Sequence, residues 1–520
     1  MRAVSGSSSS SRWWLLLVGL LAAVLCLPFV RTVTLGDEGE LLNGAERLLR
    51  GSALYADFFA FLPPGGFVLT EAWFSTVGMS FGSARLLAIL TIVGIACFTY
   101  LACWQASKSA PVSALLTTAW VVMSQGVWTQ VSHHWFTTLF SMVTAWSALV
   151  GVESQRYLRY PLIAGTAAGM AVMVTPHRGG PVMLAALTAF LNLRRHRAEL
   201  LIYVVGCSLV PIALLAYVVW HHALAAAIDD VILFTAIRYA PIQSVPFGSG
   251  PGNLLFKYLF PLAALFTLVV CARDWDTCLR DRRLWLCAAF ALAAFVGCFP
   301  RPDITHIGFA APVACPLLAC CTTRLIQWWY PMWWRYRYLV AVIAGIVISL
   351  FISSILYFLE TSLQAVQGNI VPTTRGSVTF AFIGPAAPDL PPLLLRIAST
   401  PSGDAYFFYP YLPMLRFLTA REQVSKYDLF VPEYTLPAQY QDACKSVMQH
   451  ATWVVIDRRL TDPNILKRLF PAIQDAEPPE KKRFEQALDS GFELVAQEGM
   501  FELRRRREGI SDSACSGIAE

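Results

Sequence analysis

Four carboxylate side chains stand within ten positions of one another where the first apolar run of the chain ends. They belong to the stretch TLGDEGELLNGAERLLRG, residues 34–51, and are Asp37, Glu38, Glu40 and Glu46. Burial near a low-dielectric surface raises the pKa of a carboxylate and makes it a better general base. The stretch is therefore either a solvated loop or part of an active site at a membrane surface.

The four acids differ in their position relative to the apolar segment, and this difference indicates which of them are catalytic candidates. Asp37 and Glu38 directly follow the apolar segment, and acids close to a bilayer are costly enough to indicate a function. Glu46 and Arg47 belong to an amphipathic stretch, so we expect them on the wet face of a surface helix. Asp37 and Glu38 are the catalytic candidates, and the role of Glu40 is left open.

A second group of polar residues lies at the ends of apolar segments on the same predicted side of the membrane as the acids. It comprises His133, His134, His177, Arg178, Arg301, Asp303 and His306. Each has a purely structural alternative: the histidine pair could anchor a helix end at the headgroups, and Arg178 could snorkel to the interface. Arg301, Asp303 and His306 could equally form an ion pair that caps two helices.

Composition indicates a membrane protein. The 520 residues are 56% hydrophobic and only 14% charged, whereas soluble domains have about a quarter charged residues. The excess of 40 Lys and Arg over 34 Asp and Glu is too small to indicate nucleic-acid binding. Eleven of the thirteen cysteines lie at or before Cys321, mostly in apolar runs where they pack as small apolar residues.

Eleven apolar stretches predict membrane helices, which need about 20 residues each. They are 13–30, 84–105, 112–128, 135–152, 162–175, 179–193, 199–220, 254–271, 284–299, 307–326 and 338–358. The stretches 162–175 and 179–193 are short and could form one broken hairpin. We interpret the first stretch as an uncleaved membrane helix, because no small-x-small cleavage site follows it.

Basic residues predict the orientation through the positive-inside rule. With the N-terminus in the cytoplasm, the inside loops hold Lys108, Arg156, Arg159, Arg194, Arg195, Arg197, Arg273, Arg280, Arg282, Arg283, Arg335 and Arg337. The first outside loop, 31–83, should contain two interfacial helices, near 39–51 and 67–77, separated by the helix-breaking sequence PPGG.

The chain after residue 359 differs in composition. Residues 360–520 carry charges throughout, and three stretches, 404–410, 452–457 and 492–506, predict strands. Helical patterns at 440–450 and 480–488 alternate with them, which favours a small extracytoplasmic α/β domain. We therefore expect a transmembrane domain at 1–359 and this domain at 360–520. A disulfide between Cys444 and Cys515 is left open.

The sequence resembles the GT-C membrane glycosyltransferases, with the protein-mannosyltransferase, aminoarabinose-transferase and RgtA/B/C/D-like branch most similar. The resemblance rests on the acidic pair after the first helix, on LLRGSALYADFFAFLPPGGF (48–67) and on FGSARLLAIL (81–90). HHW at 133–135, RPDITH at 301–306 and YFFYPYLPMLRFLTARE at 406–422 extend it over most of the chain.

The resemblance implies a transferase whose sugar donor is linked to polyprenyl phosphate and whose chemistry occurs at the outer face. The first-loop acid, the catalytic base or acceptor-orienting group of that family, would be Asp37 with Glu38 beside it. Arg178, Arg301 and His306 are the candidates for stabilising the leaving phosphate. His133, His134, His177, Asp303 and Tyr55 are further site candidates.

Several points stay open at this stage. Where some relatives carry a second acid this chain has His133 and His134, so no cofactor is assigned and a divalent metal is left open. The partners would be the lipid-linked donor, membrane lipids and a glycolipid, polysaccharide or protein acceptor. A lipid-sugar flippase or transporter and a non-catalytic assembly protein are the alternatives. The expected location is a bacterial plasma membrane.

Overall fold

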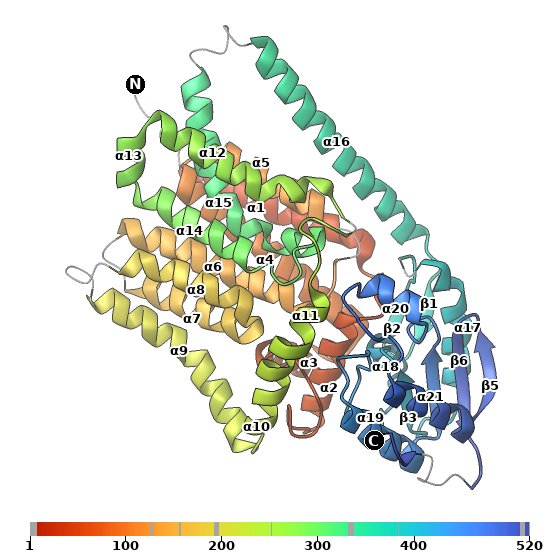
Figure 1. The fold of residues 1–520 in the computed structure, drawn as a ribbon. Helices are drawn as coiled ribbons and strands as arrows, with labels where there is room; N and C mark the ends of the chain where they lie inside the picture. The colour runs from red at the N-terminus through yellow and green to blue at the C-terminus, as the bar shows by residue number, and fades with distance from the viewer. Residues whose placement is uncertain are drawn as a thin grey trace.

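The computed structural model describes residues 8–124, 128–154, 158–191, 197–250, 252–330, 337–382, 384–509 and 515–518. Arg156, Arg194, Arg195 and Arg335, four of the basic residues predicted inside, lie outside these ranges. A helical bundle forms the larger part of the molecule, and a smaller domain with a sheet packs at one end of it (Figure 1).

Every apolar stretch predicted to span the membrane coincides with a helix. The helices are α1 (Ser8–Cys26), α4 (Phe81–Ser107), α5 (Ala110–Ser124), α6 (His133–Ser154), α7 (Arg159–Val174), α8 (Pro176–Phe190), α9 (Arg197–Trp220), α12 (Leu259–Arg273), α14 (Arg282–Val296), α15 (Ile304–Trp329) and α16 (Arg337–Gln367). The polytopic helical fold is thereby confirmed.

The eleven helices differ in length, however. Among the described residues, seven helical segments are long and apolar enough to cross a membrane. The other four, α5, α7, α8 and α14, have only 15 or 16 residues, which at 1.5 Å per residue is less than the roughly 30 Å of hydrocarbon. The pair α7 and α8 is two helices that meet at Thr175, and the Cβ of an alanine at Gly179 would lie 2.4 Å from the backbone of Ala171.

The helix ends sort to two ends of the bundle as the basic residues predict. Glu153 at the end of α6 binds Lys108 after α4, at 2.8 Å, and Arg283 at the start of α14, at 2.9 Å. Asp37, His133 and Arg301 gather at the opposite end, around one cavity. The assignment of these ends to the cytoplasm and the outside stays a prediction.

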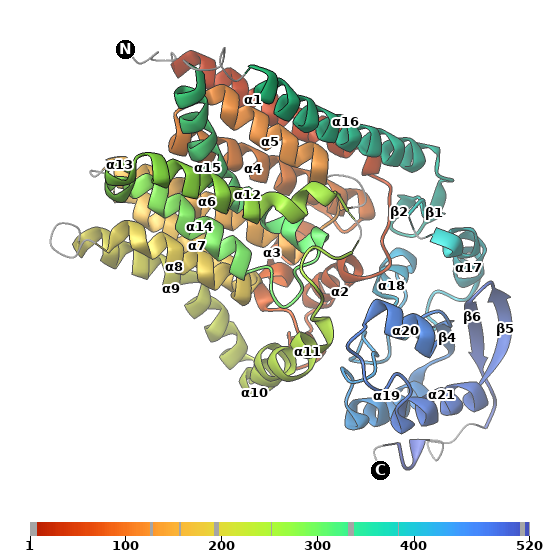
Figure 2. The ribbon, with the colours of Figure 1, turned by 45° about the horizontal axis from the view of Figure 1, so that its top comes forward.

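Short helices connect the long ones. They are α2 (Asp37–Leu49), α3 (Pro64–Val77), α10 (Leu224–Ala227) and α11 (Ala240–Gln243), with π-helical turns at Ile228–Leu233 and Thr235–Tyr239 and 3-10 turns at Leu27–Phe29 and Leu254–Tyr258. Helix α13 (Trp275–Arg280) connects α12 to α14 at the end of the bundle away from the smaller domain (Figure 2). Helices α2 and α3 correspond to the two predicted interfacial helices, and α2 starts two residues earlier than the predicted stretch at 39–51.

The C-terminal domain is α/β, as predicted. A hairpin of β1 (Val371–Thr373) and β2 (Gly376–Val378) and a 3-10 turn (Gly384–Asp389) precede α17 (Leu390–Ser399), β3 (Tyr406–Tyr409), α18 (Pro413–Thr419), α19 (Pro437–His450), β4 (Trp453–Asp457), α20 (Pro463–Leu469), α21 (Pro479–Gly491), β5 (Phe492–Glu498) and β6 (Phe501–Arg506). The strand order is β3-β4-β6-β5, with β3 parallel to β4 and the other pairs antiparallel.

Two features at the ends of this domain refine the expectations. Helix α16 runs along the edge of the bundle (Figure 2) and continues to Gln367, eight residues past the expected boundary at 359. Cys444 of α19 forms a disulfide with Cys515, a pairing that the sequence left open.

Helix α2 lies between α3 and the C-terminal domain in both views (Figures 1 and 2). Its apolar residues Leu41 and Ala45 share one hydrophobic core with Phe67 of α3 and Met414 of α18. Gly39 packs directly on the α18 backbone, and Asn43 donates a hydrogen bond to the Pro413 carbonyl at 2.6 Å. The first loop and the C-terminal domain therefore pack as one unit.

The expectation that Glu46 and Arg47 lie on a wet helix face is wrong. Glu46 is 4% exposed and binds Arg375 at 2.6 Å, and Arg47 binds Asp428 at 3.1 Å. Both partners come from the C-terminal domain, which covers the polar face of α2. A charged face becomes an ion-paired interface once another domain supplies the opposite charges.

We predict that Gly39→Ala separates α2 from α18. The new Cβ would lie 2.2 Å from the backbone nitrogen of Met414, closer than any real contact, and overpacking of this kind costs about 1–3 kcal/mol. Thermal unfolding of the detergent-solubilised protein should show a lowered midpoint. Gly180→Ala is the control, because no atom lies within 4 Å of its Cβ position. Equal midpoints for the two variants would contradict the close packing.

Candidate active site

A cavity of about 370 Å³ lies between the bundle and the C-terminal domain. The first loop, the start of α6 and the segment before α15 line one side with Asp37, Glu40, Phe61, Leu62, Trp128, Gln130, Ser132, His133, His134, Tyr239, Gln243, Arg301, Asp303, Thr305, His306 and Phe309. The C-terminal domain lines the other with Pro410, Tyr411, Leu429, Phe430, Val431, Tyr434, Leu460, Leu466, Leu469 and Phe470. This is called the interdomain cavity below.

Two acids of α2 face this cavity together. Asp37 and Glu40 are three residues apart, so they share one side of the helix. The hydroxyl of Tyr411 lies 3.2 Å from Asp37 Oδ1 and 3.0 Å from Glu40 Oε2. Burial and the neighbouring Asp37 charge raise the pKa of Glu40 to about 8, and burial together with Glu40 raises the pKa of Tyr411 well above its usual value. At neutral pH, Glu40 and Tyr411 are therefore protonated, and Asp37 is the exposed acid of the pair.

Glu38, the other predicted catalytic acid, does not line the cavity. Its side chain is fully buried and forms an ion pair with Arg85 of α4, including a 2.8 Å bond from Nη2 to Oε2. The backbone N–H of Val131 donates a second hydrogen bond to Glu38 at 2.8 Å. Arg85 also donates to the Thr32 carbonyl at 2.6 Å. This arrangement fixes the position of α2 against the bundle.

Arg301, Asp303 and His306 form a single hydrogen-bonded group on the cavity wall. Asp303 accepts from Arg301 Nε at 2.9 Å and from the ring Nδ1 of His306 at 2.8 Å, and its side chain caps α15 through the His306 backbone N–H. Burial acts to raise the pKa of Asp303, but the hydrogen bonds from His306 and Arg301 lower it below its usual value. Asp303 therefore has the structural role of pairing with Arg301 and His306 and capping α15, while Arg301 and His306 also line the cavity.

The histidines at the start of α6 lie beside this group. The ring centroids of His133 and His134 are 3.9 Å apart, and those of His134 and His306 are 4.8 Å apart. Both rings of the pair line the cavity, and each residue is 8% exposed. Three imidazoles from two helices therefore meet at one wall.

Arg178 lies behind the histidines and does not line the cavity. Its Nη1 is 3.2 Å from His134 Nδ1, and its Nη2 is 3.2 Å from the hydroxyl of Thr138. A guanidinium has donors only, so Nδ1 of His134 accepts and its proton is on Nε2. His306 has the opposite tautomer constraint, because its Nδ1 faces the Asp303 carboxylate and donates to it.

A second cavity of about 360 Å³ adjoins the first and is chiefly apolar. The two share Phe61, Leu62, His133, His134, Tyr239, Arg301 and His306. The remaining wall includes Val174, Val231, Ile232, Ala236 and Pro300, with His177 at the start of α8. The shared polar groups thus stand where a polar chamber meets an apolar one. This second space is called the apolar cavity below.

Tyr55 lies outside both cavities. It is 5% exposed, and its hydroxyl donates to the Leu62 carbonyl at 2.9 Å. Its φ of 69° is unusual for a residue with a side chain. Tyr55 therefore shapes the loop that brings Phe61 and Leu62 to the cavity wall.

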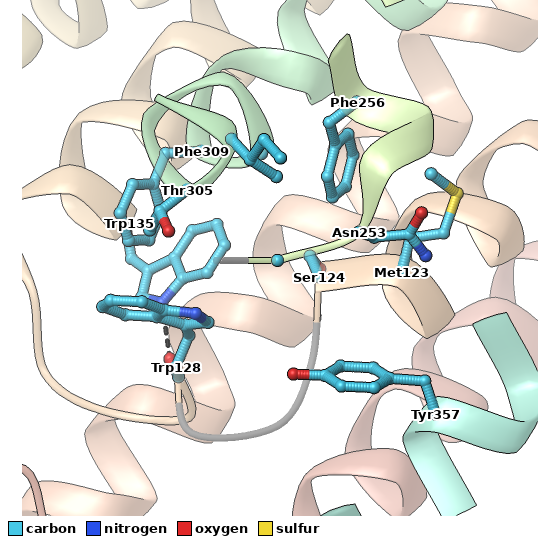
Figure 3. Close-up of a pocket in the computed structure, with 12 residues that line it drawn as sticks. Met123, Ser124, Trp128, Trp135, Asn253, Phe256, Thr305, Phe309 and Tyr357 are labelled. Atoms are coloured by element: carbon cyan, nitrogen blue, oxygen red, sulfur yellow. Dashed lines mark hydrogen bonds between the residues drawn. The ribbon is translucent and has the colours of Figure 1, made fainter. Parts of the chain in front are cut away.

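A third cavity lies on the other side of Trp128 and is shown in Figure 3. Its volume is about 40 Å³, enough for about one water molecule. Trp135 Nε1 donates to the Trp128 carbonyl at 2.8 Å. This small space lies behind Trp128, which lines the interdomain cavity, and it is too small for a sugar.

No three His, Cys, Asp or Glu side chains among the described residues are arranged to hold a metal ion. The divalent metal left open by the sequence thus finds no ligand set in this part of the chain, and no step below uses one. No sequence pattern singled out Tyr411, Tyr434 or Gln243 as site residues. Tyr411 reaches Asp37 from 374 positions away, a contact that only the tertiary fold creates.

Solved structures share this fold. ArnT from Cupriavidus metallidurans bound to undecaprenyl phosphate aligns with 97% of this chain and 99% of its own, with a TM-score of 0.53 and 14% identity. The apo state of the same protein aligns with 96% and 98%, with a TM-score of 0.51 and 14% identity. No protein-family model and no curated protein matches the sequence. At this identity the likeness shows a common fold.

We predict that Arg85→Ala destabilises the protein strongly. Removing one partner leaves the fully buried Glu38 carboxylate unpaired, which typically costs 3–5 kcal/mol. The thermal unfolding midpoint should fall far below that of Arg396→Ala, a matched break of an ion pair whose arginine is more than half exposed and worth about 0–1 kcal/mol. Equal midpoints for the two variants would show that the buried pair does not hold α2.

Proposed function

We propose that the chain is a membrane glycosyltransferase that moves a sugar from a polyprenyl-phosphate-linked donor to an acceptor hydroxyl at the outer face of a bacterial plasma membrane. The observation that carries the proposal is the position of Asp37. It faces an interdomain cavity that meets an apolar cavity at Arg301 and His306. A base, a phosphate-binding group and a lipid groove are then arranged in the order that the reaction needs.

The reaction follows from these positions. The acceptor hydroxyl gives its proton to the Asp37 carboxylate as its oxygen forms a bond to the anomeric carbon of the donor sugar. The bond from that carbon to the phosphate oxygen breaks, and the electron pair leaves with the polyprenyl phosphate. Arg301 stabilises the negative charge that develops there, and Asp303 orients both Arg301 and His306 on the cavity wall. The isoprenoid chain of the donor lies in the apolar cavity.

The roles of the other residues follow from their contacts. Glu38 is a positioning residue, because its pair with Arg85 orients the helix that carries Asp37. Arg178 is a positioning residue for His134, whose ring it contacts from behind. The Tyr411 hydroxyl is a positioning group, because it contacts the carboxyl groups of both Asp37 and Glu40.

The likeness to ArnT supports the proposal at the level of the fold, and one of its structures holds undecaprenyl phosphate. A flippase would need polar or broken helices near the middle of the membrane, whereas the polar groups here cluster at one end of the bundle. A non-catalytic assembly protein has no need for Asp37 to face a cavity. Both alternatives are therefore less well supported.

We predict that Asp37→Asn abolishes transfer. An amide cannot accept the acceptor proton, so a deletion strain complemented with this variant should lack the same envelope sugar as the uncomplemented strain. Mass spectrometry of envelope glycans and of lipid-linked sugars measures the loss. Glu71→Gln is the control, because this acid of α3 lines neither cavity and its variant should restore the sugar. Full restoration by Asp37→Asn would remove Asp37 from the mechanism.

We predict that Glu40→Gln removes the alkaline limb of the activity profile. As pH rises through about 8, Glu40 loses its proton, and a second negative charge beside Asp37 repels the donor phosphate. The donor KM of the wild type should therefore rise above pH 8, whereas that of the glutamine variant, which mimics protonated Glu40, should stay constant. Transfer rates in membrane vesicles between pH 6.5 and 9 provide the measurement. Identical profiles for the two proteins would contradict this role of Glu40.

A further inference from the structure

The C-terminal wall of the interdomain cavity differs in chemistry from the bundle wall. Every described residue that it contributes is uncharged, and Tyr411, Phe430, Tyr434 and Phe470 supply aromatic rings. Tyr434 stacks on Tyr239 of the bundle with ring centroids 5.8 Å apart and meets Phe470 edge-on at 6.0 Å. Tyrosine rings bury apolar area while offering a polar hydroxyl, which suits a ligand with C–H faces and hydroxyl edges.

Two buried polar atoms on this cavity lack good hydrogen bonds. The Tyr434 hydroxyl, on a residue 3% exposed, lies near Gln243 without forming a well-oriented bond to it. Nδ1 of His133 is buried with no partner. Such groups are rare in proteins because each one is destabilising. Both residues line the cavity, so a ligand with hydroxyl groups would satisfy either atom once that side chain turns toward the cavity.

The charges around the cavity exclude a phosphorylated acceptor. Arg301 is the only lysine or arginine among the described residues that line either cavity, and the donor phosphate needs it. A phosphorylated acceptor would then meet the charged Asp37 with no cation left to neutralise it, and like charges placed together cost several kcal/mol. The acceptor group must therefore be uncharged where it enters.

We infer that the acceptor is the free hydroxyl of a neutral sugar unit, held between the Tyr434–Phe470 wall and Asp37. This inference rests on the proposed glycosyl transfer and narrows its acceptor from any glycan, lipid or protein to a neutral carbohydrate. The transferred sugar would then be joined by a glycosidic bond to a carbon-borne hydroxyl.

Linkage analysis of the glycan altered in a deletion strain tests this inference. Methylation analysis and phosphorus–proton NMR of wild-type and deletion envelopes should locate the missing sugar on a hydroxyl of a neutral sugar. A missing sugar attached to a phosphate, or to a protein side chain, would overturn the inference and leave glycosyl transfer intact. An unchanged envelope together with unchanged lipid-linked sugars would overturn the proposed function itself.

A pair of tyrosine variants tests the wall directly. The glycan purified from the deletion strain serves as the acceptor, and membranes of the deletion strain, which lack the wild-type enzyme, supply the donor. Tyr434→Phe should raise the acceptor KM roughly tenfold, as expected for one lost hydrogen bond to a ligand, and leave the donor KM unchanged. Tyr440→Phe is the matched control, because its hydroxyl is also buried and lacks a good partner but lies outside the cavity. Equal acceptor KM values for both variants and the wild type would overturn the placement of the acceptor.

Discussion

The buried ion pair between Glu38 and Arg85 is the constraint on which the site depends. It fixes α2 in rotation against α4 and against the loop that precedes α6. Successive residues of a helix point about 100° apart, so directing Glu38 into the bundle turns Asp37 and Glu40 toward the C-terminal domain. Burial of Glu38 therefore orients α2 so that Asp37 faces the cavity, where a substrate can reach it.

The C-terminal domain completes the site as well as covering it. Tyr411 reaches the two acids of α2, and α18 packs on Gly39 of the same helix. Farther along α2, Arg47 binds Asp428 of the C-terminal domain, and Arg416 of α18 binds the same carboxylate. Docking of this domain and formation of the interdomain cavity are thus one structural event, because the same helix surface serves both.

The sequence allowed the elements of this fold to be predicted better than their contacts. Apolar runs and strand alternation are local, so the eleven helices, the four strands of the sheet and the two amphipathic stretches of the first loop were found. The ends of α5, α7, α8 and α14 differ from the predicted ends by one to four residues, because hydropathy does not show where a helix ends. Amphipathicity also cannot show what covers a polar face, which is why Glu46 and Arg47 were placed in water.

The candidate site shows the same limit. Membrane side was enough to select Asp37, His133, His134, Arg301 and His306, which line the cavity together. It was not enough to separate them from Glu38, Arg178 and Tyr55, because the direction of a side chain around its helix or loop depends on packing. Arg178 illustrates the consequence: a cation behind His134 makes Nδ1 an acceptor, while Asp303 makes Nδ1 of His306 a donor. Both rings therefore have Nε2 left free of these contacts, as an N–H donor in His134 and as an acceptor in His306, and the charged group behind each ring determines which.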